Sequence, residues 1–240
     1  MADDIADNVK LKPSEKLKIL DFFDLSLKKK RQGTIRIINN LILLFDKFPF
    51  AQNYSRNLLV AFKLDATKKR YKDWGELIYY CKYSANPVGR FFIDLSYIKK
   101  NKKLVNKKKI LDASDSLCTC LQIINHLQDC KEDYINLDRV YIPKSYFKKF
   151  SINVTTLKSS NSSKEFEELK KEIINKVEKL LSDIEKGLQF IQIWSLRKET
   201  FIILSIAKRL CFLLKRNDPL EKKIKLSRID LIFCFIKGII

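Results

Sequence analysis

The chain has 240 residues, with 48 Lys and Arg against 28 Asp and Glu, so its formal charge is +20. Hydrophobic residues make up 46% of it, and Gly and Pro contribute only 5 residues each, which excludes a disordered tail, a collagen-like chain and a linker-rich chain. The length suffices for one large domain or two small ones. Charge alone leaves nucleic-acid binding open.

Helical periodicity extends along almost the whole chain. In the first part, apolar residues recur at helical spacing from Leu17 to Leu27 and again from Ile37 to Phe48. Longer stretches keep this period with few breakers, and they cover residues 74–98, 110–134, 164–190 and 197–214. Helix-breaking signals lie between them, at Lys12-Pro13, Phe48-Pro49, 99–109, Ile142-Pro143, 159–163 and Asn217-Asp218-Pro219.

This pattern predicts an all-α bundle that forms a single domain over residues 1–240. The sequence has no strand–helix alternation, no internal repeat and no sustained heptad. Ser163 precedes an acidic run at 165–168, which predicts a capped helix start at that point.

The cysteines and termini indicate the compartment. None of the 6 Cys forms a CxxC pair, and the single His cannot complete a Cys/His zinc set, so we expect buried free thiols in a reducing compartment. The acidic start, Met1 to Asp4, is unlike a signal peptide. The apolar stretches 201–214 and 231–240 are too short or too interrupted to span a bilayer. We therefore expect a protein that is soluble or rests on a membrane surface.

Polar residues form one stripe on the helix expected at 114–134. With an advance of about 100° per residue, six of them fall on one side of an otherwise apolar helix. They are Asp115, Cys118, Gln122, Asn125, Asp129 and Asp133. A solvated face of a basic protein would carry Lys and Glu, so this stripe favours a polar seam that faces a cavity.

Two acid pairs have the spacing of one helical turn, Asp129 with Asp133 and Asp3 with Asp7, and Asp4 adjoins the second pair. Such carboxylates repel one another unless a cation lies between them. Oxygen-only clusters suit Mg²⁺, which bridges carboxylates to a phosphate. An acidic helix start would also explain the N-terminal pair taken alone. Together, the two pairs predict a site for Mg²⁺ ions and a diphosphate.

Four segments occur in an order and at a spacing that match a known family. They are Asp3-Asp4-Ile5-Ala6-Asp7, Tyr80 to Gly89, Gln122 to Asp133, and Arg139-Val140-Tyr141-Ile142-Pro143. These segments resemble the motifs of the squalene/phytoene synthases. Within them, Ser84-Ala85-Asn86-Pro87-Val88-Gly89 resembles the signature of the bacterial hydroxysqualene synthases of hopanoid biosynthesis, where other members carry Val-Ala-Gly-x-Val-Gly.

The resemblance implies an isoprenoid-synthase-type helical bundle around a central cavity. It implies that presqualene diphosphate and water become hydroxysqualene and diphosphate with the help of several Mg²⁺ ions and without NADPH. By the same resemblance, Tyr80 and Asn86 are catalytic, and five residues bind substrate: Arg70, Gln122, Asn125, Arg139 and Tyr141. The implied metal ligands are Asp3, Asp4, Asp7, Asp129 and Asp133.

Some of these residues have a structural interpretation as well. Asn86 either holds the water that quenches the carbocation or, with Pro87, only kinks the helix. We expect His126 to be packed at the core or its rim and not to act as a base, and we expect Phe190 and Trp194 in the core. The walls of an apolar tunnel are expected from Phe91, Phe92, Leu121, Ile123 and Ile124, although core packing would explain each one.

The sequence departs from the family in two places. Family members have a further helical segment before the first acid motif, so we expect the 240-residue form to be N-terminally truncated and poorly active. Asp138 stands before Arg139 where the family often has Gly, and the segment after Asp133 is one residue longer. This difference puts the reach of Arg139 in question.

Other functions remain as alternatives. The chain would be a presqualene diphosphate/squalene or phytoene synthase if it condensed prenyl diphosphates head to head, or an inactive relative that serves as an assembly or scaffold protein. Nucleic-acid binding is disfavoured, because no recognition motif is present and the basic residues are dispersed. We expect a cytoplasmic protein that is peripheral at the inner face of the cytoplasmic membrane, with pathway enzymes as further partners.

Overall fold

The computed structural model describes residues 1–29 and 33–239, which form helices joined by loops and contain no β-strand. The all-α fold expected from the sequence is confirmed. In chain order, the elements are α1 (Ala2–Asp7), α2 (Pro13–Lys29), α3 (Arg36–Lys47), α4 (Phe50–Thr67), α5 (Trp74–Ser84), α6 (Asn86–Lys99), α7 (Lys107–Gln128), α8 (Cys130–Leu137), α9 (Lys144–Lys149), the 3-10 helix η1 (Val154–Lys158), α10 (Lys164–Leu188), α11 (Trp194–Arg216) and α12 (Arg228–Ile239).

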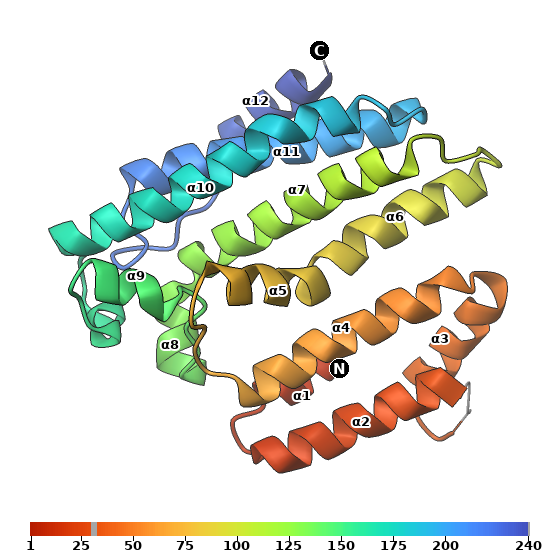
Figure 1. Ribbon diagram of the computed structural model, residues 1–240, viewed down its shortest axis with the longest axis horizontal. Coiled ribbons are helices and arrows are strands. Elements are labelled where there is room, and N and C mark those ends of the chain that lie inside the picture. Colours follow the sequence, from red (N-terminus) through yellow and green to blue (C-terminus); the bar gives the residue numbers. More distant parts are fainter. Residues whose placement is uncertain (30–32, 240) are drawn as a thin grey trace.

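The helices form two packed groups that share α4. In Figure 1, α1 to α4 lie on one side of the molecule, α10 to α12 lie on the other, and α5 to α7 run between them. Leu20, Phe23 and Phe45 belong to a hydrophobic cluster of the first group, and most other buried apolar side chains form the larger cluster around α7 and α10. The assignment of residues 1–240 to one domain stays a prediction.

Local signals placed most helix ends correctly. The Ser163 hydroxyl accepts from the Phe166 amide at 3.3 Å and caps α10, as predicted. Pro13 opens α2, α3 ends before Phe48-Pro49, and α11 ends directly before Asn217. These boundaries are set by residues within one turn of them, which is why a single sequence reveals them.

Two predicted helices are each divided in the structure. The stretch 74–98 breaks at Ala85, because Pro87 has no amide hydrogen to continue the ladder and α6 begins anew at Asn86. The stretch 110–134 breaks at Asp129, which has φ −103° and ψ 7° and separates α7 from α8. The apolar stretch 231–240 falls within an additional helix, α12, apart from its last residue, which lies outside the described part of the chain.

None of the helices in residues 1–29 and 33–239 combines the length and the apolar character that are needed to cross a bilayer.

Candidate active site

A buried carboxylate holds two tyrosines at the junction of α4, α5 and the segment after α8. The Tyr80 hydroxyl donates to Asp65 Oδ2 at 2.8 Å, and the Tyr141 hydroxyl donates to Asp65 Oδ1 at 2.7 Å. Asp65 is 5% exposed, so these bonds replace the water that its charge has lost. The Tyr71 ring stacks on Tyr141 with centroids 5.4 Å apart and fixes its plane. The two hydroxyls therefore have defined positions.

Arg139 joins this network to the N-terminal acid pair. Its Nη2 donates to the Asp65 carbonyl oxygen at 2.9 Å and pairs with Asp7 Oδ1 at 2.9 Å, while Nη1 donates to the Tyr141 hydroxyl at 3.2 Å. Asp138 takes a left-handed conformation, φ 49°, and brings the Arg139 amide to the Asp133 carbonyl oxygen at 3.0 Å. The turn at Asp138 thus accommodates the longer segment, and Arg139 reaches the acids.

Burial controls the electrostatics of the network. It raises the pKa of the Asp65 carboxyl to about 6, although Arg139 and the two tyrosine hydroxyls act in the opposite direction. Burial also raises the pKa of Tyr80 well above its usual value, with the Asp65 charge as the next cause. Tyr80 therefore keeps its proton at neutral pH and acts as a hydrogen-bond donor.

The N-terminal acids do not all face this network. Asp7 pairs with Arg139, and the pKa of Asp3 is raised by burial and by the neighbouring Asp7 carboxylate. The Asp4 side chain is 83% exposed and pairs with the Met1 amino group at 2.7 Å. The structure therefore pairs Asp7 with Arg139, whereas Asp4 pairs with the Met1 amino group.

The second acid pair lies where α7 meets α8. Asp129 Oδ1 pairs with Lys223 Nζ at 2.6 Å, and Lys223 also contacts Glu132 at 3.1 Å. The pKa of Asp133 is raised to about 7 by burial and by the Asp129 charge, while Arg139 lowers it. Although the helix breaks at Asp129, the two carboxylates still repel each other, as the sequence predicted.

The donor set fits Mg²⁺ held together with a phosphate. No three His, Cys, Asp or Glu side chains converge on one point anywhere in residues 1–29 and 33–239, so the chain does not form a complete cage there. Mg²⁺ prefers oxygen donors and usually takes one or two carboxylates, with water and phosphate oxygens completing its shell. Asp3 and Asp133 have raised pKa values, which is the condition under which a nearby cation stabilises the charged carboxylate.

The polar stripe of α7 divides into two parts. In the first part, Asp115 is held by Arg90, whose Nε donates at 2.8 Å, and is not free to face a cavity. Cys118 packs against Gly89, where a Cβ would collide with the thiol. In the second part, Gln122 is half-buried and Asn125 is exposed. Cys118 lines a cavity, as the predicted seam requires, whereas the prediction was wrong for Asp115, because Arg90 of α6 pairs with it.

His126 is packed, as expected. Its ring stacks on Tyr141 with centroids 3.5 Å apart, and its Nε2 lies 3.1 Å from Gln122 Nε2. Burial lowers the pKa of His126 to about 3, with Arg139 as a second cause, so the ring is neutral. Gln122 therefore reaches the tyrosine network through His126.

The Asn86 amide is held inside the protein. With its NH2 group turned toward α7, it donates to the Asp115 carbonyl oxygen at 3.0 Å and lies 3.0 Å from the Thr119 hydroxyl. In this orientation the NH2 group also lies 3.3 Å from the Cys81 carbonyl oxygen, which the end of α5 leaves open. These contacts fit the interpretation of Asn86 as a structural residue of the kink.

Arg70 is engaged by the loop that follows α8. Its Nη1 donates to the Lys69 and Asp138 carbonyl oxygens, and its Nη2 pairs with Asp138 Oδ1 at 2.5 Å. The guanidinium thus joins two loops, and the structure does not bring it to the carboxylate pairs. The sequence holds no signal for this contact, because Arg70 lies in a loop and its partner, Asp138, lies in a distant one.

An apolar cavity of about 220 Å³ lies between α6, α7 and α11. Phe92 and Leu121 line it, as predicted, together with Ile203 from α11. Ile123 and Ile124 are instead fully buried in the core, and Phe91 packs on Phe50 with centroids 5.8 Å apart.

Two contributors to the site were not identified as such from the sequence. Asp65 lies in an apolar helical stretch, where an isolated acid is a usable signal, because a buried charge needs partners. Lys223 lies in the loop between α11 and α12 and contacts Asp129 across more than ninety positions of chain, for which the sequence holds no signal.

Comparison with known proteins gives one consistent family. Residues 1–230 match the model of the squalene/phytoene synthase family. A hydroxysqualene synthase from Sinorhizobium fredii is 36% identical over 232 residues, which is 97% of this chain and 76% of that protein. One from Rhodopseudomonas palustris is 33% identical over 231 residues, 96% of this chain and 76% of that protein.

Solved structures agree on the fold. A dehydrosqualene synthase in complex with a ligand superposes with a TM-score of 0.80 at 20% identity, covering 99% of this chain and 81% of the other. A squalene synthase from Alicyclobacillus acidocaldarius gives a TM-score of 0.74 at 20% identity over 90% of this chain and 78% of the other.

Proposed function

Since the chain belongs to the squalene/phytoene synthase family, we propose that it converts presqualene diphosphate and water into hydroxysqualene and diphosphate. The observation that carries the proposal is Arg139, which connects the Asp7 carboxylate to the Tyr80–Asp65–Tyr141 network. In this proposal, Arg139 joins the acids that would hold the charged leaving group to the tyrosines that would face the carbocation. Relatives named hydroxysqualene synthase, at 31 to 36% identity, support this reaction.

The diphosphate would lie between the two acid pairs. Asp3 and Asp7 on α1 and Asp129 and Asp133 around α8 would hold Mg²⁺, which neutralises the charge of a departing diphosphate. Arg139 fixes the Asp7 carboxylate and offers a permanent positive charge beside it. Three further residues are proposed to contact the substrate: Gln122 and Asn125 of α7, and Tyr141 in the segment after α8.

Tyr80 is the proposed catalytic residue on the carbocation side. Its hydroxyl stays protonated and donates to Asp65, so its oxygen lone pairs and ring face are oriented by a buried negative charge. The face of an aromatic ring attracts a neighbouring cation, and the charge of the hydrogen-bonded carboxylate adds to that attraction. Asp65 is a positioning residue here, because it acts through the tyrosines that it holds. The apolar cavity between α6, α7 and α11 is proposed to take a prenyl chain.

For Asn86, the internal contacts favour the structural role, and the quenching-water role is the second hypothesis. The two differ in what Asn86→Ala should do. If Asn86 is structural, the substitution should lower the free energy of unfolding and leave the product unchanged. If Asn86 holds the water, the substitution should change the product from the alcohol hydroxysqualene to hydrocarbons that form by loss of a proton.

Product analysis tests the proposed reaction. The purified chain is incubated with presqualene diphosphate and Mg²⁺, with and without NADPH, and the lipids are extracted. Hydroxysqualene in both samples supports the proposal. Squalene that forms only with NADPH would indicate a squalene synthase instead, a reaction that the fold similarity to squalene and dehydrosqualene synthases keeps in view. Unchanged substrate, both with this chain and with a version extended at its N-terminus, would favour an assembly role.

A further inference from the structure

The outer face of α12 is apolar and exposed to solvent. Asp230, Cys234 and Gly238 are buried on the side of α12 that faces α11. Six large apolar side chains on the remaining surface are about half exposed or more: Ile229 79%, Leu231 47%, Ile232 61%, Phe233 54%, Phe235 55% and Ile236 53%. Figure 1 shows α12 beside α11 at the edge of the molecule that lies opposite α1 to α4. Single exposed apolar residues are common, but a continuous helix face of them indicates a contact surface.

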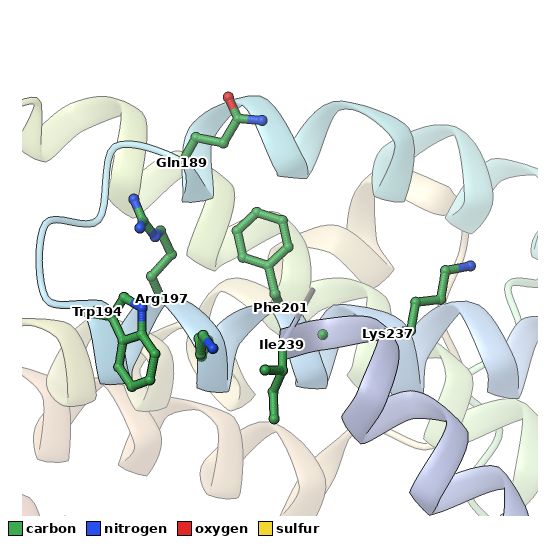
Figure 2. Close-up of a pocket in the computed structure, with 8 residues that line it drawn as sticks. Gln189, Trp194, Arg197, Phe201, Lys237 and Ile239 are labelled. Atoms are coloured by element: carbon green, nitrogen blue, oxygen red, sulfur yellow. The ribbon is translucent and has the colours of Figure 1, made fainter.

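A cationic pocket lies beside this face. It has a volume of about 440 Å³, and its lining includes Arg197, Lys198 and Lys237, the aromatic rings of Trp194 and Phe201, and no carboxylate side chain among the described residues. Figure 2 shows Trp194 and Arg197 on α11 and Lys237 on α12 around this pocket. Lys198 Nζ lies 4.1 Å from the Trp194 ring centroid. In residues 1–29 and 33–239, no acid forms an ion pair with these three cations.

The rim of the apolar face carries more positive charge. Lys225 and Arg228 are exposed at the start of α12. The acid on the helix, Asp230, is buried and pairs with Arg209 at 2.6 Å, so it adds no free negative charge to the face. A second copy of the chain docked on this face would bring the same cations together, because a two-fold interface is made of identical patches. An anionic partner with an apolar layer would instead attract these cations and cover the apolar side chains.

We propose that α12 and the adjoining cationic pocket dock the protein on an anionic phospholipid surface. The six apolar side chains enter the boundary between headgroups and acyl chains, with α12 parallel to the membrane plane. The pocket takes a phosphate-bearing lipid headgroup between Arg197, Lys198 and Lys237. Trp194, which was expected in the core but is 63% exposed, then lies at the depth that indole rings prefer in membranes.

Vesicle sedimentation tests the surface without using the reaction. The protein is mixed with vesicles of phosphatidylcholine alone or of an equal mixture with phosphatidylglycerol. We expect sedimentation with the anionic vesicles, and we expect Ile232→Glu/Ile236→Glu to weaken it by about tenfold or more, because two apolar anchors are lost. Both side chains are exposed, so the variant keeps the fold, which circular dichroism checks. The matched control is Leu25→Glu/Leu43→Glu on α2 and α3, where Leu25 is 52% and Leu43 58% exposed.

The cationic pocket has its own pair of variants. Arg197→Gln/Lys237→Gln should reduce binding to anionic vesicles, while Lys171→Gln/Lys179→Gln on α10 removes the same charge elsewhere and should bind as the unmodified protein does. Trp194 fluorescence should shift to shorter wavelength on binding, because its exposed ring leaves water for the lipid. The other of the 2 Trp residues, Trp74, is partly buried and packs against Tyr146 far along the chain from α12, so its emission should not change.

Three results would overturn the proposal. The first is an unmodified protein that does not sediment with anionic vesicles. The second is an α12 variant that binds as the unmodified protein does. The third is an unmodified protein that is dimeric by light scattering and becomes monomeric in the α12 variant, which would assign the face to a second copy.

Discussion

Two regions of this molecule reverse the usual distribution of polar and apolar groups. Around Asp65, charged and polar side chains are buried, and those of Asp65, Tyr80 and Tyr141 are joined by hydrogen bonds. On α12, large apolar side chains face outward, with cations at their border. A buried charge costs stability unless it is paired, and an exposed apolar face gains nothing in water. The first region is therefore sensitive to substitution in the isolated chain, whereas the second depends on what it contacts.

Arg139→Met should have the largest effect. It leaves Asp65 and Asp7 without their shared cation, and breaking such a buried pair costs about 3 kcal/mol or more of the free energy of unfolding. Urea denaturation measures this loss. The control, Arg90→Met, breaks the more exposed pair with Asp115 and should cost clearly less. Equal losses would mean that the Asp65 region is no more dependent on pairing than the surface.

Asp65→Asn should mainly affect the reaction. The two tyrosines donate to different oxygens of Asp65, and in Asn one of these is replaced by an NH2 group that cannot accept, so Tyr80 or Tyr141 loses its fixed position. We expect kcat to fall by about a hundredfold, with a small change in KM for presqualene diphosphate. Asp94→Asn is a matched control, because Asp94 is also buried and accepts from a tyrosine, Tyr54, at 2.7 Å. A similar loss of kcat in Asp94→Asn would remove the special role of Asp65.

The stability of the metal-free protein should decrease as the pH rises from about 4 to about 7. In the folded state, the pKa of Asp65 is about 6 and that of Asp133 about 7, both above the usual value for Asp, so folding favours the protonated forms. That contribution is lost as these groups ionise. Asp133→Asn should flatten the upper part of this slope in thermal unfolding curves, and the exposed Asp183→Asn should not. The buried neutral His126, whose pKa is lowered to about 3, contributes a slope of opposite sign below about pH 6.5. The comparison between Asp133→Asn and the unmodified protein therefore carries the test, and an unchanged slope in Asp133→Asn would contradict the raised pKa of Asp133.

Ile232→Glu should have the smallest effect in the absence of lipid. The side chain is 61% exposed, so the free energy of unfolding should change by no more than about 0.5 kcal/mol. Activity on detergent-dispersed substrate should also be unchanged. A large loss of stability would show that the α12 face is packed in solution and would weaken the contrast between the two regions.

The helices were largely predictable because their signals are local. Pro13, the Ser163 cap and the breakers at 217–219 each act within about one turn of the helix end. The same holds for the motifs, which depend on order and spacing along the chain. The break at Asp129 was missed, because the helical period continues through it without a Pro or Gly, and the sequence likewise holds no signal for the ion pair of Asp129 with Lys223 from a distant loop.

The site shows the same division. Periodicity placed Asp129 and Asp133 one turn apart and placed Asp115 on the same stripe. It could not reveal that Arg90 of α6 donates to both carboxylate oxygens of Asp115. It also could not tell that Asp65 binds two tyrosines from elements 15 and 76 residues away in sequence. Helical spacing determines on which side of its helix a side chain lies. Its contact partner depends on which other helix packs against that side.

The sequence by itself determined the helical architecture, the family and the two acid pairs, because helix periodicity and motif spacing are properties of the chain alone. Only the tertiary structure decided that Arg139 reaches Asp7, that Asp4 turns away and that His126 is neutral under the Tyr141 ring. Burial and charge pairing set these outcomes, and both are sums over neighbours that folding brings together from separate parts of the chain.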